Sequence, residues 1–588
     1  MPLSAKNLVE LYQTACSVHA ARRLFGTRSS DGWKWMRYEE FPGLVERCRA
    51  GLARLGVGPR DRVGLIASNR VEWAVVAYAT YGLGAAIVPM YEAQAPAEWR
   101  FILNDSGSKV VVASAPAVPH VQELSDPLPV LTHVIGLDRP PDDPSSFAAL
   151  CAGAPDAPSS QPQPDDVAGY IYTSGTMGQP KGVLLTHRNI VSNVRAALEL
   201  FELGTETTLS FLPWTHAFGQ TADLHAMLAA GAAIAINDDL ERLLDNLADI
   251  RPTLICAVPR IFNRLHESVH RNVDQKPRLL QALFRSALET SRKKQGGQSV
   301  SAWEHLQLAL ADRLLFSRVR AKLGGRLRIV ISGSAALGRE VAEFVDALRI
   351  PIYEGYGLTE ASPIVTANCP GGRRLGSVGR PLPGVRIVLD RNPDHRAPDL
   401  PEEQGEVLVY GENVMLGYHQ RPEETAEAIM PDGALRTGDL GYLDEDGYLF
   451  LTGRAKEQFK LENGKYVVPV HIEERLKLSP FIAQAVVYGA NRPHNVVLLV
   501  PDFQRVHEWI RTERVEAGDL VVDPRVRALF WQQVEKYTAE LRSFERPKNL
   551  LVIAQDFTTE NGMLTPSLKV KRTAVLARYG AQLEALYP

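Results

Sequence analysis

Residues 173–182 read Thr173-Ser174-Gly175-Thr176-Met177-Gly178-Gln179-Pro180-Lys181-Gly182, and they follow directly on the apolar, strand-like run 168–172. Glycines allow backbone N–H groups to approach an anion closely, hydroxyl side chains add hydrogen-bond donors, and a lysine adds a positive charge. The segment therefore predicts a loop that wraps a polyphosphate. Glycine, serine and threonine also form ordinary turns, so a purely structural loop stays the alternative for this segment taken alone.

The spacing within the segment excludes the most common phosphate loop. A Walker-type loop has the pattern Gly-x-x-x-x-Gly-Lys-Ser/Thr, whereas Pro180 occupies the position of its second glycine. The segment therefore does not predict a GTPase or kinase fold.

Length and composition limit the class of protein. A chain of 588 residues is too long for one hydrophobic core, so we expect at least two domains. With 45% hydrophobic residues and a net charge of -3, it is typical of a soluble globular protein without a general attraction to nucleic acid. The five scattered cysteines, without CxxC or Cys/His metal spacing, predict reduced thiols in a cytoplasmic protein. Neither a signal peptide nor a bilayer-spanning apolar run is expected.

Short apolar runs alternate with helical patterns up to residue 332, which is typical of parallel α/β layers. The segment 138–166, rich in Pro, Asp, Ala and Ser, is expected to be a surface connection. The expected strands are 62–67, 86–89, 109–113, 168–172, 233–236, 253–258 and 328–332, with a helix at 71–82.

The pattern changes after residue 405. Shorter strands and turn residues predict a β-rich subdomain, with a hairpin around Asp444-Glu445-Asp446-Gly447. Beyond Arg454 we expect a small mixed α/β domain, with strands at 485–488 and 496–500 and a helix from about 523 to 541.

The segment 260–328 is mostly helical and strongly basic. It contains fifteen Lys/Arg and five Asp/Glu, an excess of ten positive charges, so the remainder of the chain is net acidic by thirteen. Two apolar stripes are expected to face inward, one formed by Leu279, Leu280, Leu283, Phe284, Ala287 and Leu288 and the other by Leu306, Leu310 and Leu314. A solvated charged face over these stripes is one interpretation; contact with anionic lipid is the other.

Five further segments follow the phosphate-loop candidate in order: 332–337, 356–360, 436–440, 454–460 and 565–572. Together they resemble the motifs of the adenylate-forming superfamily, which comprises AMP-forming acyl-coenzyme A synthetases, luciferases and peptide-synthetase adenylation domains. The resemblance extends from about residue 63 to residue 572. One departure is Met177, where the superfamily usually has a second hydroxyl residue. The segment 211–219 resembles the family region that lines the acyl pocket. The segment 252–262, the helical insertion after it and the segment 463–466 resemble the long-chain fatty acyl branch.

The resemblance implies an α/β fold with two parts. An N-terminal domain, residues 1–453, would contain two doubly wound α/β subdomains, a β-rich subdomain and the helical insertion near 260–328. A hinge at 454–460 would connect it to a small mobile α+β C-terminal domain, residues 461–588.

The resemblance also implies a role for individual residues. Lys569 would be the catalytic lysine, and Thr173 and Glu360 would take part in catalysis and lie near Mg²⁺. Acyl or coenzyme A contacts would come from Trp214, His216, Phe218 and Gly464. Nucleotide contacts would come from Thr173, Ser174, Gly175, Thr176, Gly178, Lys181, Ser334, Ala335, Ala336, Glu354, Gly355, Tyr356, Gly357, Thr359, Asp439, Arg454, Lys456 and Lys460.

Several of these residues also have an ordinary structural interpretation. Glu360 suits a helix start, where the dipole favours a carboxylate, and Asp439 suits a turn. His216 could be a buried structural histidine, and Lys569 a solvated lysine in a basic tail. The order and spacing of all segments together favour the catalytic interpretation.

The implied reaction has two half-steps. A long-chain fatty carboxylate attacks the α-phosphate of Mg²⁺-bound ATP to give acyl-AMP and pyrophosphate, and the thiol of coenzyme A then displaces AMP. The C-terminal domain would turn about Lys456 between the steps, replacing Lys569 by the Gly464 face. Dimers occur among long-chain members. A cytoplasmic location, with peripheral contact at the inner membrane surface through the basic insertion, is expected.

Three alternatives stay open at this point. An acyl-AMP ligase of the same fold would load a carrier protein instead of coenzyme A. A binding protein would keep the nucleotide site without turnover, with Met177 as the hint. A membrane-surface adaptor would use the basic insertion without ATP-dependent chemistry.

Overall fold

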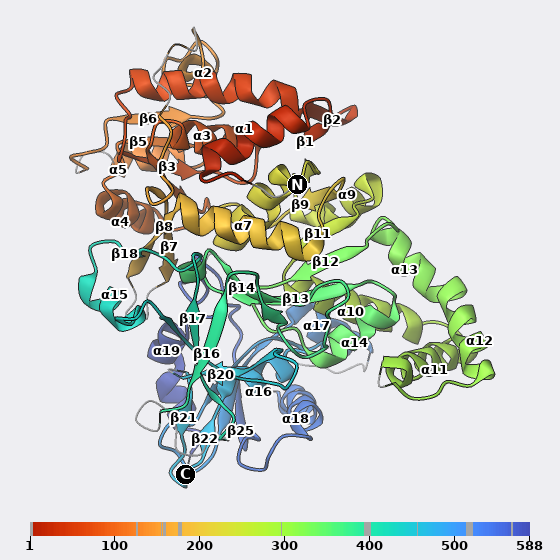
Figure 1. Ribbon diagram of the computed structural model, residues 1–588. Helices are drawn as coiled ribbons and strands as arrows, with labels where there is room; N and C mark the ends of the chain where they lie inside the picture. The colour runs from red at the N-terminus through yellow and green to blue at the C-terminus, as the bar shows by residue number, and fades with distance from the viewer. Residues whose placement is uncertain are drawn as a thin grey trace. The chain divides into compact units, whose positions relative to one another are not determined.

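The computed structural model describes the chain except residues 1–3, 125–127, 154–155, 157–159, 175–178, 296, 393–401, 456, 513–520, 522, 566–568 and 588 (Figure 1). The chain divides into two compact units. The first comprises Met1–Ile387, Leu408–Arg436 and Glu445–Leu449. The second comprises Val388–Val407, Thr437–Asp444 and Phe450–Pro588.

The first unit contains a nine-stranded sheet in the order β15-β14-β13-β12-β11-β9-β10-β1-β2. The strands from β13 through β1 run parallel, and antiparallel pairs close both edges. The bounds are β1 Arg23–Ser29, β2 Gly32–Arg37, β9 Thr207–Ser210, β10 Ala233–Ile236, β11 Leu254–Ala257, β12 Ile329–Ser332, β13 Ile352–Gly357, β14 Ile364–Ala367 and β15 Arg380–Pro381.

A seven-stranded sheet of the same unit has the order β18-β8-β7-β4-β3-β5-β6. It is parallel from β7 to β6, whereas β8 runs antiparallel to both β7 and β18. The bounds are β3 Arg62–Ile66, β4 Ala86–Met90, β5 Val110–Ala113, β6 His133–Gly136, β7 Val167–Ser174, β8 Pro180–Thr186 and β18 Gly417–Tyr418.

Helices cover the parallel strands, so these strands are apolar on both faces. All five residues of β4 are buried, as expected for a central parallel strand. Ile66, Val88 and Val111 share a core cluster with Trp99 and Ile102 of α4. The helices of this part are α1 Leu8–Val18, α2 Phe41–Arg54, α3 Val71–Tyr81, α4 Pro96–Ser106, α5 Val118–Leu124, α6 Phe147–Leu150, α7 His187–Phe201, α8 Ala226–Ala229, α9 Leu243–Ile250 and the short turns η1 Tyr38–Glu40, η2 Gly219–His225 (a π-helix) and η3 Leu240–Arg242.

The basic insertion is helical, as predicted, and its helices are gathered on one side of the first unit in Figure 1. Pro259 at the first position starts α10, and a Ser301–Glu304 capping box starts α12. The bounds are α10 Pro259–Asp274, α11 Arg278–Gln295, α12 Ala302–Ala311, η4 Asp312–Phe316, α13 Ser317–Lys322 and α14 Arg339–Ala347.

The expected apolar stripes of the insertion are wrong in part. Phe284 and Ala287 are buried, but Leu279 is 85% exposed, and Leu306 and Leu310 are 58% and 47% exposed. The reason is that α12 meets α11 through a polar face. Lys293 Nζ lies 2.8 Å from Glu304 Oε1, and Ser286 Oγ donates to Gln307 Oε1 at 2.7 Å. Glu304 and Gln307, one turn apart on α12, therefore face α11, and the side of α12 that carries Leu306 and Leu310 faces outward.

The β-rich part contains the predicted hairpin, formed by β19 Leu435–Leu443 and β20 Leu449–Arg454. These two strands continue a four-stranded sheet in the order β16-β17-β19-β20. The other elements of this region are η5 Thr359–Ala361, β16 Arg386–Asp390, β17 Gly405–Tyr410, α15 Pro422–Ala428, β21 Phe459–Lys460 and β22 Tyr466–Val467.

The second unit ends in a three-stranded sheet, β23-β24-β25, with both faces covered. Val497 and Leu499 of β24 pack in one cluster with Phe530 of α18. Val496 and Leu498 pack in another cluster with Val575 of α19, as the two-residue period of a strand requires. The bounds are α16 Pro469–Leu476, β23 Ile482–Tyr488, β24 Val496–Pro501, α17 Phe503–Thr512, α18 Pro524–Thr538, β25 Asn549–Val552 and α19 Arg572–Glu584.

Most predicted elements are confirmed, with boundaries shifted by a few residues. The predicted connection 138–166 contains the short helix α6. Within the described residues, no helix is both long and apolar enough to cross a bilayer.

Candidate nucleotide and acyl site

The phosphate-loop candidate lies at the tip of a β-hairpin. Thr173 of β7 pairs with Lys181 of β8, so both side chains are positioned by the same antiparallel ladder. Gly175, Thr176, Met177 and Gly178 lie outside the described residues, as does the Ser174 side chain. The hairpin places the loop between two strands, whereas a Walker-type loop leads into a helix.

Lys181 and Glu360 are brought together through a residue that sequence reasoning missed. Tyr418 Oη donates to Glu360 Oε1 at 2.9 Å. Lys181 Nζ lies 5.3 Å from the centroid of the Tyr418 ring, which is a cation–π distance. The same ammonium lies 2.8 Å from Glu424 Oε2. The four side chains form one charged cluster beside the hairpin.

Local structure explains how Tyr418 reaches this position. The two-residue strand β18 adds to the edge of β8, with Tyr418 opposite Val183. The Tyr418 N–H donates to Thr425 Oγ1 at 2.9 Å, which fixes the start of α15 against the strand. Burial first, and the negative charge of Glu360 second, raise the pKa of the Tyr418 phenol, so this hydroxyl stays a donor at neutral pH.

The predicted base-binding segment follows β12. Ser334 has φ +70°, a left-handed conformation that is uncommon for a residue with a side chain. The carboxyl of Glu354, on the neighbouring strand β13, is buried near the backbone N–H groups of Leu337 and Gly376, which lower its pKa. Burial raises the pKa of Glu354 to about 7. Glu354 is paired with Ser332 across β12 and β13, so its carboxyl lies beside the segment after β12. Ala335 and Ala336 lie in the same segment.

The turn after β13 requires its glycine. A Cβ on Gly357 would lie 1.8 Å from the carbonyl oxygen of Pro363, far inside van der Waals contact. A Cβ on Gly355 would lie 3.2 Å from the carbonyl oxygen of Thr366. Tyr356 and Thr359 are buried. The close backbone approach fixes the chain that carries Glu360.

The predicted acyl segment, 211–219, is held from within by a hydrogen-bond network that sequence reasoning missed. Asn69 Oδ1 accepts from Trp214 N at 2.8 Å, and Asn69 Nδ2 donates to Leu212 O at 2.7 Å. Trp214 Nε1 donates to Ser210 Oγ at 2.9 Å. The Trp214 ring is fully buried and lies 5.7 Å from the Trp73 ring. The Trp214 ring therefore packs in the protein core.

Phe218 and His216 lie at the other end of the segment. The Phe218 ring is 3.3 Å from the position of a Cβ on Gly333, so the acyl candidate and the base-binding segment are neighbours. Phe218 N donates to His216 Nδ1 at 3.2 Å. A Cβ on Gly219 would lie 2.2 Å from Pro213 O, which makes this turn specific for glycine.

A buried acid lies at the end of the Asn69–Ser210 network. Ser210 Oγ donates to Asp223 Oδ2 at 2.5 Å, from strand β9 to the π-helix η2. Burial raises the pKa of Asp223 to about 7, although the hydrogen bond from Ser210 lowers it. Through Ser210, Asp223 supports the acyl segment. Its carboxyl changes protonation state near neutral pH.

In the second unit, the ribose candidates form an ion pair. Arg454 Nε lies 2.7 Å from Asp439 Oδ1, and Asp439 is buried. Asp439 N donates to Thr437 Oγ1 at 3.0 Å, and Gly438 N donates to Glu406 Oε1 at 3.0 Å. The neighbouring strands β19 and β20 therefore present Asp439 and Arg454 together. Lys456 lies outside the described residues.

Lys460 and Gly464 lie on a small hairpin, β21–β22. Lys460 Nζ is 5.6 Å from the Tyr466 ring centroid. Gly464 has φ +83°, and its N–H donates to Leu461 O at 2.9 Å. Because positive φ favours glycine, the sequence places glycine where this turn needs it.

Lys569 is exposed at the end of a loop whose base is closed by backbone contacts. Thr565 N donates to Lys569 O at 2.8 Å, and Lys569 N donates to Thr565 Oγ1 at 3.0 Å. Residues 566–568 lie outside the described part of the chain. The contact with Thr565 determines where the Lys569 backbone lies.

A Mg²⁺ ion that also binds phosphate oxygens needs few protein ligands. Among the described residues, no group of three or more His, Cys, Asp or Glu could hold a metal. Glu360 is a partly exposed carboxylate near the phosphate-loop hairpin, and Glu424 of the same cluster pairs with Lys181. This donor set fits a magnesium ion shared with a nucleotide, and not a metal enclosed by protein.

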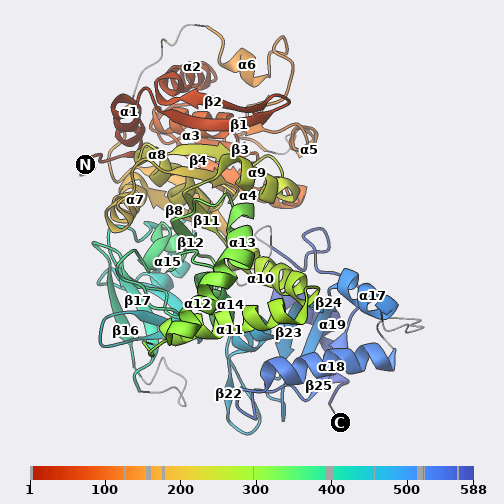
Figure 2. The same ribbon diagram turned by 90° about the vertical axis from the view of Figure 1, so that its right-hand side faces the viewer.

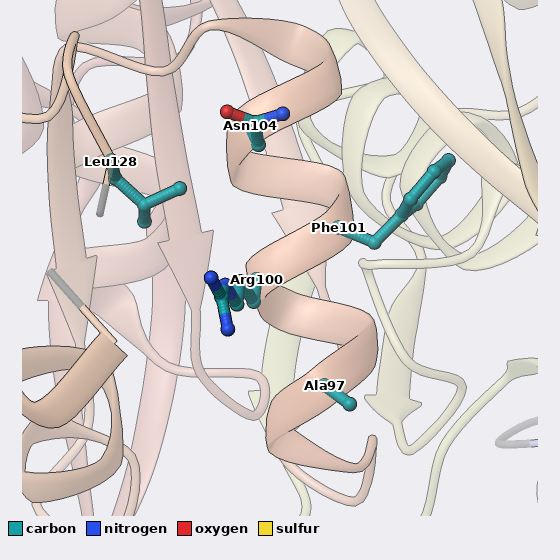
Figure 3. Close-up of a pocket in the computed structure, with 5 residues that line it drawn as sticks. All are labelled: Ala97, Arg100, Phe101, Asn104 and Leu128. Carbon is teal, nitrogen blue, oxygen red and sulfur yellow. The ribbon is translucent and has the colours of Figure 1, made fainter.

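A separate pocket of about 330 Å³ lies along α4. Figure 3 shows Leu128 opposite the helix, with Arg100 and Phe101 pointing to different sides. Its lining contains none of the predicted site residues; it consists of Ala97, Arg100, Phe101, Asn104 and Leu128.

Comparison with known protein families shows which family the chain belongs to. Residues 13–419 match the AMP-binding enzyme family, and residues 456–588 match the AMP-binding enzyme C-terminal domain. The chain belongs to the AMP-binding enzyme family. This confirms the predicted membership of the adenylate-forming superfamily.

Named relatives cover nearly all of the chain. The long-chain-fatty-acid–CoA ligase FadD15 of Mycobacterium bovis is 32% identical over 95% of this chain and 94% of its own length. The peroxisomal long chain acyl-CoA synthetase 7 of Arabidopsis thaliana is 31% identical over 97% of this chain and 85% of its own length.

Solved structures confirm the fold class. The adenylation domain of the carboxylate reductase from Mycobacterium chelonae has a TM-score of 0.80 at 24% identity, covering 99% of this chain and 91% of that chain. A fatty acyl CoA synthetase of Mycobacterium tuberculosis has a TM-score of 0.64 at 23% identity, covering 98% and 99%. The predicted α/β fold, with a large N-terminal part and a smaller C-terminal part, is confirmed.

Proposed function

We propose that this chain is an ATP-dependent long-chain fatty acid–CoA ligase. It converts a fatty carboxylate and ATP into acyl-AMP and pyrophosphate, and then transfers the acyl group to the thiol of coenzyme A with release of AMP. Membership of the AMP-binding enzymes supports the first half-reaction. Similarity over nearly the whole chain to proteins named long-chain acyl-CoA ligases supports the substrate and the acceptor.

The structural observation that carries the proposal is the charged cluster of Lys181, Tyr418 and Glu360 beside the phosphate-loop hairpin. A lysine neutralises phosphate charge, and a carboxylate is a hard oxygen ligand for magnesium. Lys181 now pairs with Glu424. Binding of ATP would exchange this ion pair for contacts with the β- and γ-phosphates.

The other residues of the first unit bind and orient the substrates. The segment 333–337 and Tyr356 receive the adenine, Thr173 and Thr359 donate to phosphate oxygens, and Phe218 and His216 flank the acyl carboxylate. When bound, Mg²⁺ would be held by Glu360, with Thr173 nearby, and would neutralise charge on the phosphates. The Gly333–Phe218 contact supports this arrangement, because it places the base and acyl segments side by side.

The second unit supplies the remaining groups. Asp439 accepts the ribose hydroxyls, Arg454 stays beside it, and the ammonium of Lys569 stabilises negative charge between the attacking carboxylate and the α-phosphate. We propose a domain 1–453, a hinge 454–460 that includes Lys456, and a domain 461–588. The two family matches, 13–419 and 456–588, support these boundaries. Rotation about the hinge would replace Lys569 by the face that carries Gly464, so that coenzyme A can enter. Lys460 would also lie near the nucleotide.

A substrate panel tests the proposed function. Purified protein is incubated with Mg²⁺-ATP and saturated acids from C2 to C20, with and without coenzyme A, and AMP and pyrophosphate are measured. We expect the fastest AMP release with C14–C18 acids and a strong dependence on coenzyme A. AMP release only with an acyl carrier protein would favour the carrier-loading alternative. Absence of pyrophosphate release with every acid would refute adenylation.

We also propose that the basic insertion binds anionic lipid near the membrane surface. On α12, Trp303, Leu306 and Leu310 are 65%, 58% and 47% exposed and lie on one side of the helix. The segment 260–328 contains fifteen basic and five acidic residues. An exposed aromatic and aliphatic stripe within basic surroundings is the pattern of a helix that lies in the lipid interface.

Vesicle co-sedimentation tests this contact. Wild type should sediment with vesicles containing phosphatidylglycerol at physiological salt, and the double variant Trp303→Ala/Leu306→Ala should stay in the supernatant. Leu240→Ala is the matched control, because Leu240 is 67% exposed on a different helix. Equal sedimentation of the double variant and wild type would exclude this face as the lipid contact.

A further inference from the structure

Two of the five cysteines meet in the first unit. Cys48 lies on α2 and is fully buried, and Cys151 follows α6 and is partly exposed. They are 103 positions apart in the chain (151 minus 48). Figure 2 shows α2 and α6 side by side, and these helices are in contact.

Backbone packing brings the two residues together. A Cβ on Gly51 would lie 2.1 Å from the carbonyl oxygen of Leu150, so α2 touches the chain immediately before Cys151. Arg54 Nη2 donates to Leu150 O at 2.9 Å and to Ala152 O at 2.7 Å. Cys48, Gly51 and Arg54 are spaced by three residues and share one face of α2. The Cys151 backbone is thus held on that face from both sides.

The thiols differ in chemical character. The proximity of the two thiols raises the pKa of Cys48 and lowers the pKa of Cys151. The charges of Arg47 and Arg54 lower the pKa of Cys151 further, whereas burial raises the pKa of Cys48. Cys151 is therefore the more nucleophilic and more accessible thiol, and Cys48 is the buried partner.

We propose that Cys48 and Cys151 form a redox-sensitive pair that hydrogen peroxide converts to a disulfide. The Cys151 thiolate attacks one peroxide oxygen, the O–O bond breaks, and Cys151 becomes a sulfenic acid while hydroxide leaves. Cys48 then attacks the Cys151 sulfur, the S–S bond forms, the S–O bond breaks, and water leaves with the Cys48 proton. Both thiols are oxidised by one peroxide, which is reduced to two waters.

The disulfide would join α2 to the turn after α6 and close a loop that contains all elements from β3 to α6. Cross-linking removes conformational freedom from the unfolded chain, so oxidation should raise Tm by roughly 5–10 °C for a loop of this length. This inference goes beyond the proposed function, because neither cysteine belongs to the proposed substrate sites.

Peptide mapping tests the pair. Reduced protein is treated with hydrogen peroxide, denatured, alkylated with iodoacetamide and digested without reductant. We expect a cross-linked peptide joining Cys48 to Cys151, with the mass lower by two hydrogens. Cys369→Ser, which removes another partly exposed thiol, should leave the cross-link unchanged. Recovery of both residues as alkylated thiols, or a cross-link to a different cysteine, would overturn the proposal.

Single variants test the order of the steps. In Cys48→Ser, dimedone should label Cys151 as a trapped sulfenic acid; in Cys151→Ser, residue 48 should stay unlabelled. Labelling of Cys48 in Cys151→Ser would contradict the assignment of the attacking thiol. If a variant fails to fold, the wild-type peptide map decides alone. These readouts are covalent and do not depend on acyl-CoA synthesis.

Discussion

The Tyr418→Phe substitution removes one hydroxyl and keeps the ring. Tyr418 Oη donates to Glu360 Oε1 at 2.9 Å, and the ring lies over Lys181 Nζ at 5.3 Å. The variant therefore keeps the cation–π contact and the pairing with β8, but leaves the Glu360 carboxylate without this donor. If Glu360 holds Mg²⁺ as proposed, its altered position should slow acyl-AMP formation.

The size of the effect follows from the kind of hydrogen bond lost. A hydrogen bond to a charged group contributes about 1.5–3 kcal/mol, and each 1.4 kcal/mol is about tenfold in rate or affinity. We therefore expect kcat/KM for Mg²⁺-ATP to fall by roughly ten- to a hundredfold, with partial recovery at high Mg²⁺.

Pyrophosphate release with a saturating long-chain acid measures this effect across a Mg²⁺ titration. Tyr410→Phe is the matched control, because Tyr410 Oη also donates to a carboxylate, Asp432 Oδ2, at 2.7 Å. We expect Tyr410→Phe to keep wild-type kinetics. If Tyr418→Phe stays within threefold of wild type at every Mg²⁺ concentration, Tyr418 does not position Glu360 for catalysis.

Three other substitutions test separate parts of the account. Gly357→Ala places a Cβ 1.8 Å from Pro363 O, so thermal unfolding should show a free energy of unfolding lower by about 1–3 kcal/mol. Gly204→Ala is the control, because its new Cβ meets nothing within 4 Å, and it should unfold like wild type. Burial raises the pKa of Asp223 from 3.8 to about 7, so its contribution to stability is present below its unfolded pKa and is lost as pH rises through about 7. The Tm of Asp223→Asn relative to wild type should therefore rise between pH 4 and pH 7; a constant difference would contradict this sign. Met177→Thr restores the hydroxyl usual in the superfamily and should lower KM for ATP by roughly two- to tenfold, whereas an unchanged KM would show that this hydroxyl is not used.

Local sequence signals predicted the elements but not all of their contacts. The apolar runs that became β3, β4 and β10 were predicted because central parallel strands are continuously hydrophobic. The apolar pattern of α12 was misinterpreted, because the helix packs through Glu304 and Gln307 and leaves Leu306 exposed. Periodicity identifies an apolar side but does not determine which side meets a neighbour.

The candidate site was predicted where residues follow one another in a motif, and missed where they meet through the fold. Glu360 was found within its motif, but Tyr418 comes 58 residues later and approaches only because β18 adds to β8. Asn69 is 145 residues from Trp214. A two-residue strand and a single asparagine give no local signal, so such partners appear only once the sheets are assembled.

The most direct test of the central claim separates the two half-reactions in Lys569→Ala. Single-turnover formation of acyl-AMP from palmitate and labelled Mg²⁺-ATP is measured first, and conversion of added palmitoyl-AMP to palmitoyl-CoA second. Because Lys569 is proposed to stabilise charge only during adenylation, we expect a loss of roughly 10²–10³ in the first rate and a second rate near that of wild type. Undiminished acyl-AMP formation, or an equal loss in both half-reactions, would contradict the proposed mechanism.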